Sequence, residues 1–215
     1  MKKIEDFRKS YLAGKLELDD LNGDPIIQFS AWWHDAVASE IVEPNAMTLA
    51  TVNADGQPSA RIVLLKGISE NGFEFYTNYQ SQKARDIESN PNVALLFLWK
   101  ELERQVRIEG VAEKVTREKS QAYFQSRPRG SQIGAWASPQ SVIIPDREIL
   151  ENKVNEISLQ YSHIDPLPLP EFWGGYIVHP HQIEFWHGRP DRMHDRFRYS
   201  RNKKGENWSI DRLAP

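Results

Sequence analysis

The sequence predicts a mainly β protein, a mixed antiparallel barrel with a few peripheral helices. The first observation is a series of short apolar segments separated by hairpin signals, among them Asp55-Gly56 and Asn71-Gly72. The second is that strands and helices do not alternate along the chain, which argues against a doubly wound parallel sheet. The third is length, since one barrel-type domain can occupy all 215 residues. We therefore expect a single domain over residues 1–215.

Two helices are expected before the first strand. Three apolar residues at helical spacing and a glycine that can end a helix predict the first one, at Ile4, Phe7, Tyr11 and Gly14. The second helix has a clearer start, because Asp24 can cap it and Pro25 suits its first position. Its apolar residues continue to Val37.

The central region is predicted to hold most of the sheet. Its expected strands, each bounded by turn or polar residues, are Ala46–Asn53, Pro58–Ser69, Phe73–Asn78, Val93–Trp99 and Glu103–Val115. Val93–Trp99 is almost continuously apolar, which predicts burial on both of its faces. Helices with a capping residue at the start are expected at Ser81–Ser89, Thr116–Ser126 and Asp146–Tyr161.

The C-terminal region is predicted to return to strands after a stiff proline-rich connector, Asp165–Pro170. The expected strands are Trp173–Trp186, Met193–Asn202 and Asn207–Leu213. The whole chain then holds some six to eight strands, which suits a small antiparallel barrel.

The composition excludes several classes of protein. Lys and Arg number 27 and Asp and Glu number 30, and this balance argues against a general nucleic-acid binder. No window approaches the length of an apolar membrane span, and the N-terminus lacks the apolar stretch of a signal peptide. There is no cysteine, which removes thiolate nucleophiles and fits a reducing cytoplasm. We expect a cytoplasmic protein without nucleic-acid or membrane partners.

Three segments combine cations with hydroxyl or aromatic side chains. In Arg61–Lys66, two cations bracket an apolar strand and could grip an anion, although charges at strand ends also commonly reach solvent. Tyr76–Lys83 joins a strand end to a helix start, where amides and hydroxyls could hold a phosphate or simply cap the helix. Tyr123–Trp136 carries arginines, serines and a tyrosine around a Pro-Arg-Gly turn. This combination suits a phosphate dianion, and a purely structural role for the segment is an equally open alternative.

A fourth segment, Gln182–Arg196, combines basic residues with tryptophan and histidine. If Met193 begins a strand, His194 and Arg196 share one face of it. A nucleic-acid patch is the alternative, and two nearby aspartates weaken it. The histidines of this region match no familiar ligand spacing, so no metal site is predicted. Together the four segments suit a ligand that carries both phosphates and flat rings.

The four segments, in this order, resemble the pyridoxamine 5′-phosphate oxidase family from about Arg8 to Pro215. The strongest element is Ile183–Trp186 followed by Arg192–Arg196. The other motifs that look like those of the family are Arg61–Lys66, Glu103–Val106, Ser126–Pro128 with Ser131–Trp136, and the ending Asp211–Pro215. Each motif is weak alone, but the set is highly specific.

The resemblance implies an FMN-binding split barrel and a homodimer whose active sites lie at the interface and draw residues from both chains. It implies FMN-dependent oxidation of pyridoxamine 5′-phosphate or pyridoxine 5′-phosphate to pyridoxal 5′-phosphate. Molecular oxygen would be the electron acceptor and hydrogen peroxide a product. A mobile N-terminal segment at about residues 1–20 would help to close each site. A chain without cysteine suits this chemistry, because the flavin carries out the redox step.

The resemblance also implies three sets of site residues. The cofactor-binding residues would be Arg61, Ile62, Val63, Leu64, Leu65, Lys66, Tyr76, Thr77, Gln82, Lys83, Gln105, Gln140, Ser141, Trp186 and Arg196. The substrate-binding residues would be Arg8, Tyr11, Lys66, Tyr123, Arg127, Ser131, Arg192, Met193 and His194. Arg192 and His194 would be catalytic, over the substrate ring beside the flavin. Gln82 departs from the family, which often has arginine there, and this leaves one fewer cation for the flavin phosphate.

Two other functions stay open at this point. Another flavin enzyme could use the same barrel for a different substrate. A non-catalytic carrier could bind flavin or pyridoxal phosphate without turnover. The pairs Arg127 with Ser131 and Arg192 with His194 favour the oxidase over a flavin reductase, and release of peroxide on adding pyridoxamine phosphate would separate the oxidase from a carrier.

Overall fold

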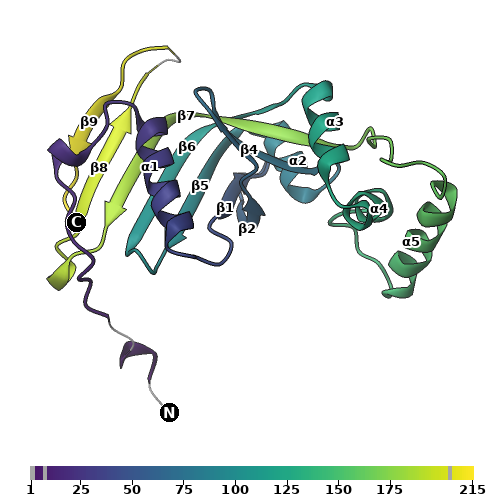
Figure 1. Ribbon diagram of the computed structural model, residues 1–215, viewed down its shortest axis with the longest axis horizontal. Coiled ribbons are helices and arrows are strands. Elements are labelled where there is room, and N and C mark those ends of the chain that lie inside the picture. The colour runs from purple at the N-terminus through teal and green to yellow at the C-terminus, as the bar shows by residue number, and fades with distance from the viewer. Residues whose placement is uncertain (1–2, 7–8, 203–204) are drawn as a thin grey trace.

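The computed structural model describes residues 3–6, 9–202 and 205–215, and within them the chain builds one curled antiparallel sheet of nine strands (Figure 1). The strands are β1 Ala46–Val52, β2 Pro58–Leu64, β3 Gly67–Ser69, β4 Gly72–Asn78, β5 Asn92–Trp99, β6 Arg104–Lys114, β7 Trp173–His187, β8 Asp195–Ser200 and β9 Ser209–Arg212. Their main order is β2-β1-β5-β6-β7-β4-β3, with β8 beside β7 and β9 beside β8. The mainly β fold with few helices confirms the predicted fold class.

Strand β7 joins the two ends of the molecule. One edge pairs with β6 along almost its whole length. The other edge is shared, because β4 pairs with residues 173–178 and β8 with residues 182–187. Groups held at opposite ends of β7 are therefore fixed far apart within one chain (Figure 1).

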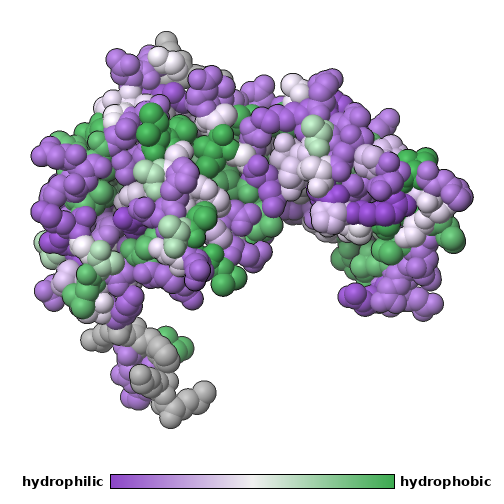
Figure 2. Space-filling model, viewed as in Figure 1, coloured by the Kyte–Doolittle hydropathy of each residue, from purple (hydrophilic) through white to green (hydrophobic). Residues whose placement is uncertain are grey.

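The helices lie at two places around the sheet (Figure 1). They are α1 Pro25–Ala38, α2 Gln82–Ser89, α3 Arg117–Ser126, α4 Arg129–Ala137 and α5 Glu148–Gln160, with short 3₁₀ turns at η1 Ile4–Asp6, η2 Leu18–Asp20 and η3 Pro190–Arg192. Helix α1 covers one face of the sheet and buries Phe29 and Trp32 against strand residues. Its predicted cap forms, since the backbone N–H of Ile26 donates to Asp24 Oδ1 over 2.7 Å. Helices α3 to α5 form a lobe at the far end of the molecule, and Figure 2 shows a hollow between this lobe and the sheet.

The two faces of the sheet differ in burial. The face under α1 is a closed apolar core that includes Leu49, Leu95 and Phe185. The opposite face leaves Ile62 on β2 and Leu98 on β5 63% and 62% exposed. A row of paired positions continues across this outer face through Leu98, Gln105, Trp186 and Arg196. This sheet face therefore differs from the one under α1, because it exposes large apolar side chains.

Three predicted strand features need correction. The expected strand Pro58–Ser69 is two strands, β2 and β3, because β2 pairs with β1 and β3 turns away to pair with β4. Val93–Trp99 is not buried on both faces, since its burial alternates and Leu98 is exposed. The described residues also hold nine strands where six to eight were expected.

Two further predictions were wrong, one in the N-terminal segment and one at Met193. In the part of the predicted N-terminal helix that the structure describes, only η1 is helical, and residues 9–13 follow an irregular path. Phe7 lies outside the described residues. Met193 does not begin a strand, because Asp191 and Arg192 have φ angles of 55° and 62° and the chain turns through η3 before β8 begins at Asp195. Extended strand requires negative φ, so two left-handed residues delay it.

Within the described residues, no helix is long and apolar enough to cross a membrane.

Candidate functional site

A pocket of about 310 Å³ lies where β2, β4, α2 and α3 meet. Its walls carry several cations and aromatic rings, and its lining residues are Arg61, Ile62, Val63, Leu64, Lys66, Tyr76, Thr77, Lys83, Tyr123, Arg127, Gln140 and Trp173. All of these except Trp173 were expected from the sequence. Tertiary folding therefore brings together three of the four predicted segments.

Lys83 is the most buried cation of this pocket, at 9% exposure. Its Nζ donates to Gln140 Oε1 over 3.0 Å and to the hydroxyls of Thr77 and Ser81 over 3.3 Å each. The pKa of Lys83 is lowered to about 8, mainly by burial and further by nearby Arg61, whereas Asp86 opposes the shift. All three hydrogen-bond partners are neutral, so the ammonium charge is available to an anionic ligand.

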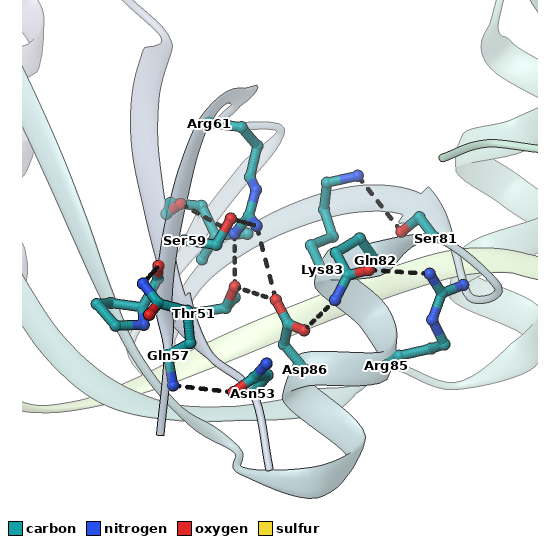
Figure 3. A network of polar contacts seen from close by, with 12 residues as sticks. Thr51, Asn53, Gln57, Ser59, Arg61, Ser81, Gln82, Lys83, Arg85 and Asp86 are labelled. Carbon is teal, nitrogen blue, oxygen red and sulfur yellow. Dashed lines mark hydrogen bonds and ion pairs between the residues drawn. The ribbon is translucent and has the colours of Figure 1, made fainter. Parts of the chain in front are cut away.

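Arg61 is held in place by a polar network from three elements (Figure 3). Its Nη1 donates to Thr51 Oγ1 over 2.6 Å and its Nη2 to Ser59 Oγ over 2.8 Å. Asp86, which is 2% exposed, lies 3.7 Å from Nη2 and accepts a 2.7 Å hydrogen bond from Thr51. A guanidinium fixed in this way loses little conformational entropy when it binds an anion.

Gln82 is not among the residues that line the pocket. Its Nε2 donates to Asp86 Oδ1 over 2.7 Å, and its Oε1 accepts from Arg85 over 3.1 Å (Figure 3). The side chain therefore supports the carboxylate behind Arg61 instead of facing the pocket. The amide nitrogen and the amide oxygen of Gln82 each already have a partner, and the side chain carries no charge.

Aromatic rings form one wall of the pocket. The rings of Tyr76 and Tyr123 stack with centroids 4.0 Å apart, and Trp173 stacks on Tyr76 at 5.7 Å. Burial, aided by Glu74 and neighbouring tyrosines, raises the pKa of Tyr76 to about 12, so its phenol stays protonated. Trp173 was missed as a site residue, although an aromatic residue at the first position of a strand after a proline-rich connector could have marked it.

Arg127 extends this wall with an incompletely paired charge. Its guanidinium lies 4.7 Å above the Trp173 ring, and its buried Nη1 has no hydrogen-bond partner among the described residues. Burial lowers the pKa of Arg127, which reflects the cost of keeping this cation away from water. A buried donor without a partner is expensive, and an anionic ligand would relieve that cost.

A second pocket, of about 490 Å³, lies at the other end of the sheet. It is lined by Lys9, Ser10, Tyr11, Arg189, Asp191, Arg192 and His194. The His194 ring lies 4.6 Å from Trp186 and 5.5 Å from Tyr11, measured between centroids. Its Nδ1 accepts a hydrogen bond from the backbone N–H of Arg189. Burial, followed by Arg192, lowers the pKa of His194, while Asp195 opposes the shift, so the neutral ring is favoured.

The remaining predicted residues lie outside both pockets. Gln105, Trp186 and Arg196 pair in one row across β6, β7 and β8, and Arg196 Nε donates to Glu184 over 2.8 Å. Leu65 belongs to the apolar core at 5% exposure. Ser131 is exposed on α4, Ser141 in the loop that follows it, and Met193 after η3. Arg8 lies outside the described residues.

The two groups of predicted residues do not meet within one chain. Thr77 of the first pocket pairs with Gly174, and Gln105 of the distant row pairs with Trp186. Gly174 and Trp186 are twelve residues apart on β7, about 40 Å of extended strand. One small-molecule site cannot span that separation inside a single protomer.

Comparison with known proteins decides the family. A family model described as "Pyridoxamine 5'-phosphate oxidase" matches residues 33–161, and one described as "Pyridoxine 5'-phosphate oxidase C-terminal dimerisation region" matches residues 173–215. The chain belongs to the pyridoxamine 5′-phosphate oxidase family. Relatives named pyridoxine/pyridoxamine 5′-phosphate oxidase occur in Salinibacter ruber, 53% identical over all of both chains, and in Leptospira interrogans, 54% identical over 99% of each.

Solved structures share this fold. PhzG from Burkholderia lata 383, in complex with tetrahydrophenazine-1-carboxylic acid, matches with a TM-score of 0.85 and 31% identity over 92% of this chain and 95% of its own. An FMN-binding protein related to the oxidases, from Nostoc punctiforme, matches with a TM-score of 0.70 over 91% of this chain and 100% of its own. Its identity is 21%, so that likeness supports the fold alone.

Proposed function

We propose that this protein catalyses the FMN-dependent oxidation of pyridoxamine 5′-phosphate or pyridoxine 5′-phosphate to pyridoxal 5′-phosphate, with molecular oxygen as electron acceptor and hydrogen peroxide as product. The observation that carries the proposal is the first pocket, where Arg61, Lys83 and Arg127 converge beside stacked aromatic rings in a member of the oxidase family. We place the protein in the cytoplasm, where its cysteine-free sequence suits the reducing conditions.

The residues of the first pocket fit a flavin phosphate. Arg61 and Lys83 supply two charges, and Thr77 adds a hydroxyl on the same side. Because both cations are already oriented by hydrogen bonds, they can hold a phosphate dianion without rearrangement. FMN held by these residues would supply the redox chemistry, with the substrate carbon that bears the amine or alcohol as hydride donor and oxygen as final electron acceptor.

The substrate phosphate fits a neighbouring part of the same pocket. Arg127 offers its unpaired Nη1, with Tyr123 and Lys66 also in the lining. A planar guanidinium suits a phosphate because it can donate two parallel hydrogen bonds. This assignment leaves Arg61 and Lys83 for the flavin.

Arg192 and His194 would act on the substrate ring. Since His194 Nδ1 accepts a hydrogen bond, the proton of its neutral ring is on Nε2, which can donate to a substrate oxygen. Arg192 would orient the substrate and stabilise developing negative charge. Both residues are on the second pocket, so they reach the first only if a second protomer brings them there.

We therefore propose that each active site is shared between two chains of a homodimer. The exposed apolar residues Ile62 and Leu98 provide a surface for the partner, and the row Gln105, Trp186 and Arg196 lies on the same sheet face. A twofold interface would place this row near the partner's first pocket and create two equal sites. The match of residues 173–215 to a dimerisation region supports this arrangement.

The shared site can be tested by mixing two impaired variants, Arg127→Met and Arg192→Leu. A hybrid dimer would hold one site with both changes and one site with neither. Random assortment of the two chains should therefore restore about a quarter of the wild-type activity. If each active site were built from one chain only, mixing the variants would restore no activity. Sedimentation that shows an active monomer at assay concentration would also contradict the proposal.

Binding of FMN should weaken as the pH rises above 8. The pKa of Lys83 is about 8 without a ligand, and a bound phosphate dianion would raise it by favouring the ammonium form. Binding above pH 8 must then take up a proton, so the Kd for FMN should rise by up to about tenfold between pH 8 and pH 9. Titration of the apoprotein at several pH values measures this change.

Two controls make the pH experiment specific for Lys83. Riboflavin lacks the phosphate, so its Kd should change much less over the same range. A Lys83→Arg variant keeps its charge at these pH values and should show a flat profile for FMN. Two outcomes would mean that Lys83 does not contact the phosphate. One is an equal rise of the Kd for FMN and for riboflavin, and the other is a Kd for FMN that rises with pH in Lys83→Arg as it does in the wild type.

The visible spectrum tests the proposed reaction most directly. Purified protein loaded with FMN should show a flavin band that bleaches when pyridoxamine 5′-phosphate is added without oxygen. Admission of oxygen should restore the band and release hydrogen peroxide. A band that does not bleach with either phosphorylated substrate would contradict the proposed function and favour a carrier or a flavin enzyme with another substrate.

A further inference from the structure

The N-terminal segment of residues 9–13 is attached to the body of the protein through one carboxylate. Glu103 Oε2 accepts hydrogen bonds from the backbone N–H groups of Leu12 and Ala13, over 2.7 and 2.8 Å. Its Oε1 lies 2.7 Å from Lys9 Nζ. Three contacts from a segment about ninety residues away in the sequence thus end on a single side chain.

Glu103 combines an uncommon backbone conformation with a buried carboxylate. It ends the turn between β5 and β6 with a φ of 55°, in the left-handed region that favours glycine. Such a conformation costs about 1 kcal/mol or more in a residue with a Cβ. The Glu103 side chain is also 5% exposed, and the bonds from the N-terminal segment compensate its burial. The burial of this carboxylate therefore depends on the contacts that the N-terminal segment provides.

The attachment fixes the position of Tyr11. The Tyr11 ring meets Trp186 and His194 edge-on, with centroid distances of 5.6 and 5.5 Å. The Tyr11 ring also packs directly against Gly188. A Cβ added to Gly188 would lie only 2.7 Å from Tyr11 Cγ, so a larger residue there would collide with the ring. The backbone N–H of Gly188 donates to the carbonyl of Glu103, so the same residue supports Tyr11 from two directions.

A separate attachment holds the segment further along. The backbone N–H of Leu16 donates to Asp195 Oδ2 over 3.0 Å, and Arg212 bridges Asp195 and Glu17. These contacts do not involve Glu103. Loss of the Glu103 carboxylate should therefore release residues 9–13 while residue 16 stays attached.

We propose that Glu103 is a positioning residue, which anchors residues 9–13 so that Tyr11 lies against His194 and encloses the substrate side of the active site. The kinetic part of this proposal rests on the proposed function. The anchoring itself is a property of the free protein and can be measured without substrate.

Two substitutions separate anchoring from folding. Glu103→Gly removes the carboxylate and suits the positive φ, so it adds no backbone strain to the turn. Glu103→Gln keeps the size of the side chain but removes the charge that faces Lys9. Glu101→Gln is the matched control, because Glu101 lies in the same turn and its carboxylate lies 3.7 Å from neighbouring Lys100 Nζ.

Hydrogen exchange in the free protein measures the anchoring. In Glu103→Gly, the amides of Leu12 and Ala13, which donate to the carboxylate in the wild type, should exchange at least tenfold faster, whereas Leu16 and strand β6 should keep their protection. Glu103→Gln should show a smaller increase and Glu101→Gln none. Unchanged exchange at Leu12 and Ala13 in Glu103→Gly would overturn the proposal.

Kinetics and a double variant measure the positioning. Glu103→Gly should raise the KM for pyridoxamine 5′-phosphate about tenfold, with an unchanged Kd for FMN, because an enclosing contact to bound substrate is lost. If Glu103 acts through Tyr11, the combination with Tyr11→Ala should be hardly worse than Tyr11→Ala alone. Additive effects, or faster exchange without a change in KM, would overturn the positioning role. If the wild type oxidised neither substrate, the proposed function would fail, and the exchange result would still decide whether Glu103 anchors the segment.

Discussion

Replacement of Arg192 by leucine should lower kcat/KM for pyridoxamine 5′-phosphate by about two orders of magnitude, or ~3 kcal/mol, with FMN still bound. Arg192 is exposed in the single chain and shares a pocket with Tyr11 and His194. Its φ of 62° and that of Asp191, 55°, hold it in a sharp turn beside the His194 ring. Leucine keeps much of the bulk of the side chain but has no hydrogen-bond donor. The decrease in kcat/KM therefore measures the contribution of the guanidinium group.

A second arginine variant controls for a general effect of charge. Arg147→Leu changes the residue just before α5, whose side chain is 87% exposed. Helix α5 lies at the opposite end of the molecule from β8, the strand that follows η3 (Figure 1). Arg147→Leu should leave kcat/KM and FMN binding unchanged. If Arg192→Leu behaved in the same way, Arg192 would not belong to the active site, and loss of flavin from Arg192→Leu would assign it to the cofactor instead.

Replacement of Arg127 by methionine should raise the KM for pyridoxamine 5′-phosphate about fiftyfold, since a charge-assisted hydrogen bond to a phosphate contributes about 1.5–3 kcal/mol. The free energy of unfolding should change by less than about 1 kcal/mol. The variant loses the contact of the guanidinium with Trp173, 4.7 Å away, but it also removes a buried donor that has no partner. Thermal unfolding and steady-state kinetics together check both expectations.

The neighbouring Arg129 should give the opposite result. Its two terminal nitrogens each donate over 2.7 Å to a backbone carbonyl, those of Ile164 and Tyr161. Arg129→Met should therefore lower the unfolding temperature and leave the KM for substrate unchanged. A rise in KM for Arg129→Met, or a large loss of stability for Arg127→Met, would show that the pocket has been assigned to the wrong arginine.

Local signals in the sequence predicted most of the framework. Asp24 and Thr116 cap their helices as expected, because a cap needs only a side-chain oxygen and backbone amides two or three residues away. The hairpin signals at Asp55-Gly56 and Asn71-Gly72 also mark real turns between strands. The failures lie where distant contacts decide, as in the N-terminal segment, which follows the carboxylate of Glu103 instead of its helical spacing.

Periodicities and turn signals in the sequence predicted the fold class, and family motifs implied the family and, by resemblance, nearly all residues of the first pocket, because such signals are local in the chain. Only the tertiary structure decided where those residues lie. It added Trp173 to the pocket, turned Gln82 toward Asp86, and placed Arg192 and His194 at the opposite end of β7. The physical reason is that a motif specifies side-chain chemistry, whereas strand register and a long central strand fix the separation between motifs. That separation exceeds the reach of one site, and it is what requires a second protomer in the proposed reaction.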